Sequence, residues 1–248
     1  MKLFIYGFFM AWGMFLWIPC PFPKWNERAR GHMLACLPFI GCIVGGLWAL
    51  AAWALGLFAC PPAIYALILA CVPWCVTGFI HLDGFMDVCD AVLSRRDIEE
   101  RRRILKDPHC GAFAVICLVL LVLTSFCVFF SADGEVSLLP LAMIPVATRA
   151  CAGLAVMCLR PLETSQYAGS ERRGTSLVIL PAIMLCIACA LPVILYGTGG
   201  LAPTAAALGY WLLALYGVKK LGGISGDISG FALVCGELAG AAVLIFVR

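Results

Sequence analysis

The sequence predicts an all-α fold, a polytopic integral membrane helical bundle that forms one domain over residues 1–248. The chain is 63% hydrophobic and 12% charged, with a mean hydropathy of +1.02, whereas soluble domains are roughly 25% charged. Four long stretches contain no Asp, Glu, Lys or Arg: 3–23, 31–82, 108–132 and 174–218. A transmembrane helix needs about 20 apolar residues. The longest stretches must therefore each hold two spans joined by a turn.

We expect about seven transmembrane helices of the usual length, at 33–58, 62–80, 111–131, 138–159, 175–197, 200–217 and 228–247. Prolines 61 and 62 and the glycines at 197–200 separate paired spans. The apolar segment 3–18 ends at Pro19. An eighth span, a re-entrant segment and an interfacial helix are all compatible with it. It lacks the charged start and the cleavage site of a secretory signal peptide.

Basic residues lie in alternate connections, which predicts the orientation. Five Arg and Lys106 lie within 95–106, and Arg172 and Arg173 lie in the loop before the span at 175–197. The intervening connections hold no Lys or Arg. By the positive-inside rule the basic connections are cytoplasmic. We therefore expect a multi-pass membrane protein in contact with the lipid bilayer, with its basic connections in the cytoplasm.

Three of the fourteen acidic residues, Asp83, Asp87 and Asp90, fall in one eight-residue window. Positions i, i+4 and i+7 share one stripe of a helix. We expect this helix to cover 83–106 and to lie partly outside the bilayer, as a catalytic helix that faces the cytoplasm. Its acids would face a polar cleft. Its apolar members would face the membrane: Phe85, Met86, Val88, Val92 and Leu93.

Like charges on one stripe repel each other, and a bound hard cation such as Mg²⁺ removes that penalty. Asp107 could close the same site from the end of the helix. The alternative is a solvated face on which the acids pair with Arg95 or Arg96.

Further polar groups fall in places where charge or glycine needs a reason. The glycine-rich turn Gly222–Asp227 allows backbone N–H groups to approach a phosphate, or Asp227 to reach a metal. Arg149 and Glu237 lie within expected spans, where a charge is costly and usually faces a polar interior. A purely structural pair is the alternative for these two.

Zinc and redox sites are not expected. The three histidines form no ligand spacing with cysteines. The single Cys-x-x-Cys, Cys186 and Cys189, lies inside an expected span without a second pair. The residues alone thus indicate a cytoplasm-facing, Mg²⁺-dependent site for a phosphorylated substrate.

Three motifs resemble the adenosylcobinamide-GDP ribazoletransferase (cobalamin synthase) family. They are Thr77–Ala91 (TGFIHLDGFMDVCDA), Lys106–Phe113 (KDPHCGAF) and Leu221–Asp227 (LGGISGD). The segments Ile18–Pro21 and Leu37–Gly41 are similar to the first segments of that family. The chain departs from the family pattern at Ser225, where Thr is usual, and at Cys20.

The resemblance implies a transferase that acts last in vitamin B12 assembly. Such enzymes join adenosylcobinamide-GDP to α-ribazole, or to its 5′-phosphate, and release GMP with Mg²⁺ as cofactor. It implies metal ligation by Asp83, Asp87, Asp90 and Asp227, and catalytic roles for Asp83, Asp87, Asp90 and Asp107. It also implies substrate contacts at His81, Lys106, Arg149, Lys219, Lys220 and Gly223. No nucleic acid is expected as a partner, and a homo-oligomer is compatible with the sequence.

Three rival functions are weaker. CDP-alcohol phosphatidyltransferases have a similar Asp-Gly-x-x-Asp pattern, but they usually carry Ala-Arg where this chain has Asp87-Val88, and their later acids lie further on. A transporter would use Arg149 and Glu237 to line its path, yet the acids cluster at one boundary and no inverted repeat is evident. A membrane scaffold explains the composition but not the acidic stripe.

Overall fold

The computed structural model describes residues 2–58, 60–132, 134–163 and 176–247. Two isolated one-turn helices, η1 (Glu27–Ala29) and η2 (Gly197–Gly200), accompany the α-helices. The α-helices are α1 (Lys2–Phe15), α2 (Arg30–Ala35), α3 (Leu37–Leu57), α4 (Pro62–Val76), α5 (Ile80–Leu93), α6 (Ile98–Ile104), α7 (Ala112–Phe130), α8 (Leu138–Cys158), α9 (Ser176–Tyr196), α10 (Ala202–Leu221) and α11 (Gly226–Phe246). The described ranges hold no strand beyond one isolated bridge between Pro161 and Ile224.

The predicted helical membrane bundle is confirmed, with fewer spanning helices than expected. Within the described ranges five helices are long and apolar enough to cross a membrane: α3, α7, α8, α9 with η2, and α11. The bent pair α4–α5 brings the number to six if it counts as one span. Helix α10 forms over the span expected at 200–217. It is not among the five because Tyr210, Trp211 and the terminal Lys219 and Lys220 make it less apolar.

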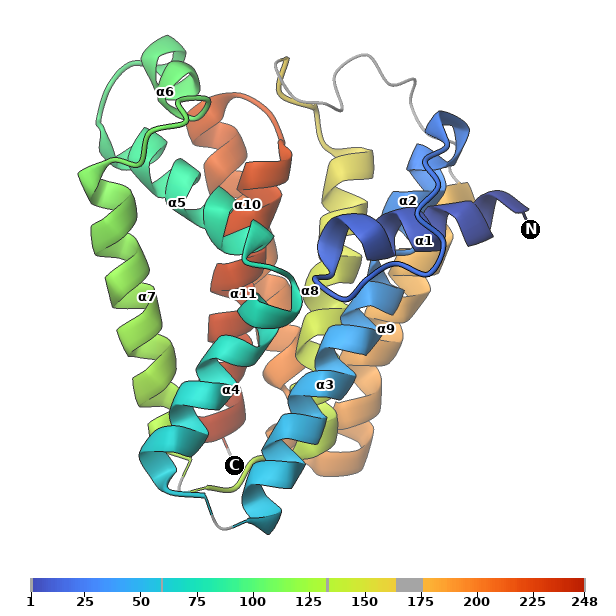
Figure 1. The fold of residues 1–248 in the computed structure, drawn as a ribbon, viewed down its shortest axis with the longest axis vertical. Helices are drawn as coiled ribbons and strands as arrows, with labels where there is room; N and C mark the ends of the chain where they lie inside the picture. The colour runs from blue at the N-terminus through green and yellow to red at the C-terminus, as the bar shows by residue number, and fades with distance from the viewer. Residues whose placement is uncertain (1, 59, 133, 164–175, 248) are drawn as a thin grey trace.

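Helices α8 and α11 form the centre of the bundle (Figure 1). In both, 72% of the most apolar stretch is buried, against 28% in α7 and 17% in α9. Small residues such as Ala147, Gly153, Gly236 and Ala241 let neighbouring helices approach these two closely. Helix α3 packs on α8, α10 packs on both central helices, and α9 packs on α8. The exposed apolar faces of α7 and α9 are the surfaces suited to lipid.

A sharp bend separates α4 from α5. The two helix axes differ by 93°, and the turn between them places Gly78 and Phe79 at φ +59° and +63°. Inside α4, Pro73 has no N–H to donate, and the hydroxyl of Thr77 donates to its carbonyl at 2.8 Å. Helix α4 therefore ends at Val76, before the expected end at 80, and the bend makes the expected span part of a broken pair with α5.

The helix expected over 83–106 is also corrected. It ends at Leu93 and restarts at Ile98, with Arg95 in the left-handed region at φ +56°. Asp97 caps the second helix, because its carboxylate accepts a hydrogen bond from the N–H of Glu100 at 2.9 Å.

The apolar face of α5 does not face the membrane as expected. Phe85 and Val88 are buried, and the Phe85 ring stacks on Phe231 of α11 at 5.8 Å between centroids. Of the five expected members, Leu93 is exposed. Helix α5 crosses α11 and α7, so protein covers the stripe that the sequence alone assigned to lipid.

The described basic connections lie at one end of the bundle, as predicted. Helix α6, the segment 159–163 and the turn 222–225 share this end, whereas the end of α3, the start of α4 and the connection 134–137 lie at the other (Figure 1). The segment 159–163 and the turn 222–225 are joined by backbone hydrogen bonds between Ile224 and both Arg160 and Leu162. Arg172 and Arg173 lie outside the described residues. Helix α1 has 14 residues, about 21 Å at 1.5 Å per residue, which is short for a span.

Candidate active site

The acidic stripe lies on α5, opposite the start of α11. Asp83 is exposed, and Asp87 and Asp90 are half-buried. Asp227, in the first turn of α11, is brought to the same place because Gly84 packs against its backbone. A Cβ on Gly84 would lie 2.8 Å from the Asp227 Cα, so a side chain there would separate the helices. Asp83, Asp90 and Asp227 all act electrostatically on Asp87.

Asp90 also has a structural task that the sequence did not reveal. Its carboxylate accepts hydrogen bonds from the backbone N–H of Gly111 at 2.5 Å and of Ala114 at 3.2 Å. These donors belong to the start of α7, whose own N-cap residue is Gly111 and has no side chain to offer. Asp90 is therefore the N-cap of a neighbouring helix. A glycine just before the apolar run 112–130 was the available signal.

The carboxylates fit a hard cation in chemistry but do not converge on one point. Four carboxylate groups supply only oxygen donors, which Mg²⁺ prefers. Across the described residues, no group of three or more His, Cys, Asp or Glu side chains is arranged so that it could hold a metal ion. Nor does any residue in these ranges form a salt bridge with Asp83, Asp87, Asp90 or Asp227, so the expected alternative of pairing with Arg95 or Arg96 is not seen.

One cavity of about 260 Å³, which we call the His109 cavity, borders the stripe on the side of the α6–α7 loop. It is lined by Asp83, Met86, Asp87, Asp90, Leu105, Lys106, Asp107, Pro108, His109, Cys110 and Ala114. The site thus brings together four predicted acids and Lys106.

Asp107 and His109 form a pair within that loop. The Asp107 carboxylate accepts from the His109 backbone N–H at 3.0 Å and lies 2.7 Å from His109 Nδ1. These contacts hold the pKa of the Asp107 carboxyl below its ordinary value, the backbone hydrogen bond first and the imidazole second. A lowered pKa makes Asp107 a weaker proton acceptor. His109 lines the site although the sequence did not single it out as a substrate residue.

A second cavity, of about 280 Å³, lies on the other side of Asp83, and we call it the Arg149 cavity. Asp83 lines both cavities. Helices α1, α2, α3, α5, α8 and α11 supply its walls: Met14, Phe15, Leu34, Leu37, Ile40, Ile80, His81, Asp83, Arg149, Ala152, Val156, Gly226, Asp227, Ser229, Gly230 and Leu233.

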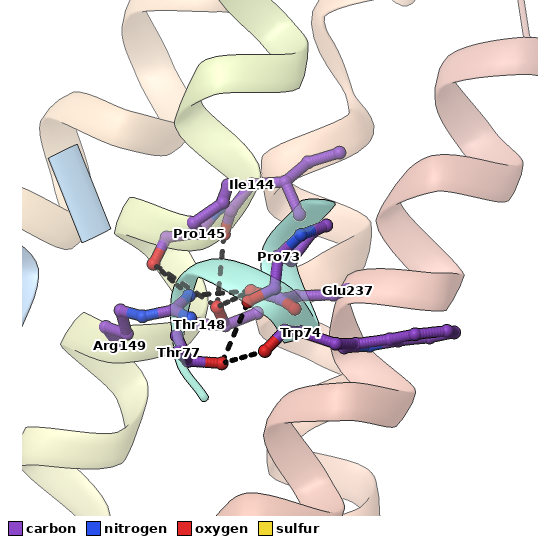
Figure 2. A network of polar contacts seen from close by, with 8 residues as sticks. All are labelled: Pro73, Trp74, Thr77, Ile144, Pro145, Thr148, Arg149 and Glu237. Atoms are coloured by element: carbon purple, nitrogen blue, oxygen red, sulfur yellow. Dashed lines mark hydrogen bonds and ion pairs between the residues drawn. The ribbon is translucent and has the colours of Figure 1, made fainter. Parts of the chain in front are cut away.

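Two predicted substrate residues, His81 and Arg149, meet in this second cavity. The His81 ring stacks on Phe15 of α1 at 5.9 Å between centroids, and its Nε2 is buried without a hydrogen-bond partner. Arg149 is 2% exposed and pairs with Glu237 at 2.6 Å (Figure 2). Ser229 also lines the cavity and shares a hydrogen bond of 2.9 Å with Tyr210. No pattern in the sequence marked Ser229.

Three predicted substrate residues do not line either cavity. Lys219 and Lys220 lie at the end of α10, where the Lys220 ammonium is 5.6 Å from the Tyr216 ring centroid. Gly223 packs against the backbone of Leu162. A Cβ on Gly223 would lie 2.6 Å from the Leu162 nitrogen. Its turn is held by Arg102, whose Nε donates to the Leu221 carbonyl at 2.7 Å.

Comparison with known proteins places the chain. A family model described as cobalamin-5-phosphate synthase matches residues 7–245. The adenosylcobinamide-GDP ribazoletransferase of Clostridium perfringens (strain 13) is 40% identical over 98% of this chain and 99% of its own length. Proteins of that name from Clostridium botulinum (strain Alaska E43) and Geobacillus kaustophilus are 35% and 31% identical, over 97% and 93% of this chain and 97% and 92% of their own lengths. No solved structure matches the chain. The chain belongs to the cobalamin-5-phosphate synthase family.

Proposed function

We propose that the chain joins adenosylcobinamide-GDP to α-ribazole, or to its 5′-phosphate, and releases GMP in a Mg²⁺-dependent reaction. One observation carries the proposal: two cavities of similar size meet at Asp83, with the acidic stripe on one side and Arg149 on the other. Two substrates that must bring a hydroxyl to a pyrophosphate need such an arrangement, because in-line positioning and charge neutralisation dominate phosphoryl transfer.

Asp83, Asp87, Asp90 and Asp227 would hold Mg²⁺ only after their side chains turn toward one point, because they do not converge in this structure. Bound there, the ion would neutralise phosphate charge. This role accounts for acids gathered without a basic partner, which is otherwise unfavourable. Asp90 would serve it while it caps α7, as one carboxylate has two oxygens and several lone pairs.

The His109 cavity suits the pyrophosphate of the GDP donor. It carries Asp83, Asp87 and Asp90, and Lys106 adds a positive charge at its rim. At about 260 Å³ it is below the ~300–1,000 Å³ typical of small-molecule sites. A corrin macrocycle is far larger, so the cobinamide must stay outside while the pyrophosphate reaches in.

The Arg149 cavity suits the ribazole. Phe15, Leu37 and Ile40 give it an apolar wall that matches a flat aromatic base, and His81 and Arg149 supply polar contacts. Asp83 lies where the two cavities meet. It is placed to orient the attacking hydroxyl, whereas the lowered pKa of Asp107 makes that carboxylate a weak acceptor for the proton.

The bonds balance in a direct displacement. The ribazole hydroxyl oxygen bonds to the phosphorus attached to cobinamide, the bond from that phosphorus to the bridging oxygen breaks, and GMP departs with that oxygen. When the 5′-phosphate is the acceptor, its 5′ oxygen is already esterified, so another ribose hydroxyl attacks. Neither cavity has a Ser or Cys paired with a His base, which argues against a covalent intermediate among the described residues.

The decisive experiment uses full-length protein purified in detergent. Adenosylcobinamide-GDP, α-ribazole or its 5′-phosphate, and Mg²⁺ should yield GMP and one product whose mass equals the sum of the remaining parts. A chelator should stop the reaction and added Mg²⁺ should restore it. Release of GDP would overturn the proposed displacement, and formation of CMP from a CDP-alcohol would support the phosphatidyltransferase alternative.

We further propose that the protein lies in the bacterial inner membrane with both cavities open to the cytoplasm. The basic connections and the α6–α7 loop share one end of the bundle, and α11 ends at the other (Figure 1). The positive-inside rule then puts the C-terminus outside the cytoplasm. A C-terminal alkaline phosphatase fusion should be active and a green fluorescent protein fusion dark; the reverse pattern would overturn this orientation.

A further inference from the structure

An ion pair is buried between the two central helices. Arg149 of α8 and Glu237 of α11 are 2% and 4% exposed, and Nη1 of Arg149 lies 2.6 Å from Oε1 of Glu237 (Figure 2). The same Nη1 donates to the Pro145 carbonyl at 3.3 Å. Thr148, one residue earlier on α8, directs its hydroxyl to Glu237 Oε1 at 3.5 Å. The Glu237 carboxylate is therefore held from α8 by two neighbouring side chains.

The rest of the guanidinium has no such partner. Nε and Nη2 of Arg149 are both buried and form no hydrogen bond with the residues that the structure describes. Arg149 lines the Arg149 cavity, but Glu237 does not. Glu237 instead lines a small hollow of about 20 Å³ behind it, with Trp74 and Ser125. Arg149 thus stands between the cavity and Glu237.

Two unpartnered guanidinium nitrogens are unusual at a buried residue. A buried donor without a partner loses the hydrogen bonds it would make to water. A purely structural ion pair would be expected to satisfy more of the guanidinium. The Nε–Nη2 edge is also the planar fork that binds two oxygens of one phosphate. Arg149 lines the cavity and this edge of its guanidinium is buried and unused, which indicates that a ligand in the cavity completes it.

We propose that Glu237 is a positioning residue. By holding Nη1, it fixes the guanidinium so that the Nε–Nη2 edge serves as a two-point donor to a phosphoryl group of a substrate in the Arg149 cavity. This inference rests on the proposed function and adds a residue that does not itself line the cavity. Because Glu237 offsets the charge of Arg149, the pair would bind the phosphoryl group through correctly oriented hydrogen bonds and not through a net positive charge.

The first test is steady-state kinetics of GMP release by the full-length protein. Glu237→Gln keeps an oxygen acceptor but loses charge assistance. The KM for α-ribazole 5′-phosphate, the phosphorylated substrate proposed for the Arg149 cavity, should therefore rise about three- to tenfold, while kcat changes less. Glu237→Leu should raise KM by at least about tenfold. Ser125→Ala, in the same hollow but remote from the guanidinium fork, is the matched control and should keep the wild-type KM.

The second test asks whether Glu237 acts through Arg149. The double variant Arg149→Leu/Glu237→Leu should be no less active than Arg149→Leu, because a positioning residue has no effect once its partner is gone. Free guanidinium should restore part of the activity of Arg149→Ala, and it should not do so in Arg149→Ala/Glu237→Leu. The conservative Glu237→Gln variant keeps the question open to measurement if Glu237→Leu does not fold.

The outcomes are distinct from a failure of the proposed function, which would appear as wild-type protein that releases no GMP. With an active wild type, an unchanged KM in Glu237→Gln would overturn the inference. Full additivity of the two leucine substitutions would also overturn it, as would guanidinium rescue that does not depend on Glu237.

Discussion

Two groups of charged side chains lie within one small region of the bundle, and they are compensated in opposite ways. Arg149 and Glu237 neutralise each other at 2.6 Å between two central helices. Asp83, Asp87 and Asp90 lie along α5 and Asp227 lies at the start of α11, all without a described salt-bridge partner. Charge inside a membrane bundle is costly. The compensated pair is therefore suited to hold a group in place, and the uncompensated acids are suited to bind a cation.

Substitution of the acids should have the largest effect of all on catalytic activity, which separates them from the ion pair. Asp83→Asn and Asp87→Asn should each lower kcat/KM for GMP release by about a thousandfold or more, as removal of a preorganised charge from phosphoryl transfer costs several kcal/mol. The thermal midpoint should stay the same or rise without Mg²⁺, because one of several repelling charges is gone. Activity assays paired with thermal unfolding in detergent measure both quantities.

Mg²⁺ gives an independent check on the same acids. It should raise the thermal midpoint of the wild type, because a ligand that binds only the folded state stabilises it. The rise should be lost in Asp87→Asn and kept in Asp97→Asn, a matched change at an acid that caps α6 away from both cavities. Near-normal turnover in both single variants, Asp83→Asn and Asp87→Asn, would refute the metal role.

The ion pair should have the opposite signature, with a large effect on stability. Arg149→Leu or Glu237→Leu alone leaves a buried charge unpaired, which typically costs about 3–5 kcal/mol. The double leucine variant should recover most of that loss, since two apolar side chains replace the pair. Denaturant or thermal unfolding of the four proteins would show this non-additivity. Simple addition of the two losses would mean that the pair is not coupled.

Asp90 lies between the two cases, because it belongs to the acidic stripe and also caps α7. Asp90→Ala should lower the free energy of unfolding by about 0.5–2 kcal/mol, the usual range for a lost N-cap. Asp83→Ala, which removes no such cap among the described contacts, should not. A chemical unfolding series compares the two variants. Equal losses would show that the hydrogen bonds to Gly111 and Ala114 contribute little.

The class of fold and the core of the site could be predicted from the sequence. Uncharged stretches set by the membrane predicted a helical bundle, and the spacing of Asp83, Asp87 and Asp90 predicted their common stripe. The glycine-rich turn and the intramembrane charges drew attention to Asp227 and Arg149, and the structure shows that both line the Arg149 cavity. These features depend on local spacing or on the cost of charge, both of which can be read along a chain.

What could not be predicted depends on contacts between distant segments. The left-handed backbone at Gly78 and Phe79 turns α5 across α11, so Phe85 and Val88 pack on protein instead of lipid. An apolar stripe does not reveal which apolar surface covers it. For the same reason the sequence did not show that the turn next to Lys219 and Gly223 packs on Arg102 and Leu162, and the substrate role of these two residues stays a prediction.

The smallest expected effect concerns pH and the loop beside the acids. His109 lowers the pKa of Asp107 in the folded protein, so the ionised carboxylate is favoured there. Its stabilising contribution is complete above the ordinary Asp pKa of about 4 and is lost as the pH falls through the lower folded value. The difference in thermal midpoint between wild type and Asp107→Asn should therefore be present at about pH 6 and shrink progressively as the pH falls below about 4. Because Asp107 is exposed, the difference should be small and should shrink with added salt. A difference that grows as the pH falls would contradict the assigned direction, and Asp97→Asn would serve as the control for general acid effects.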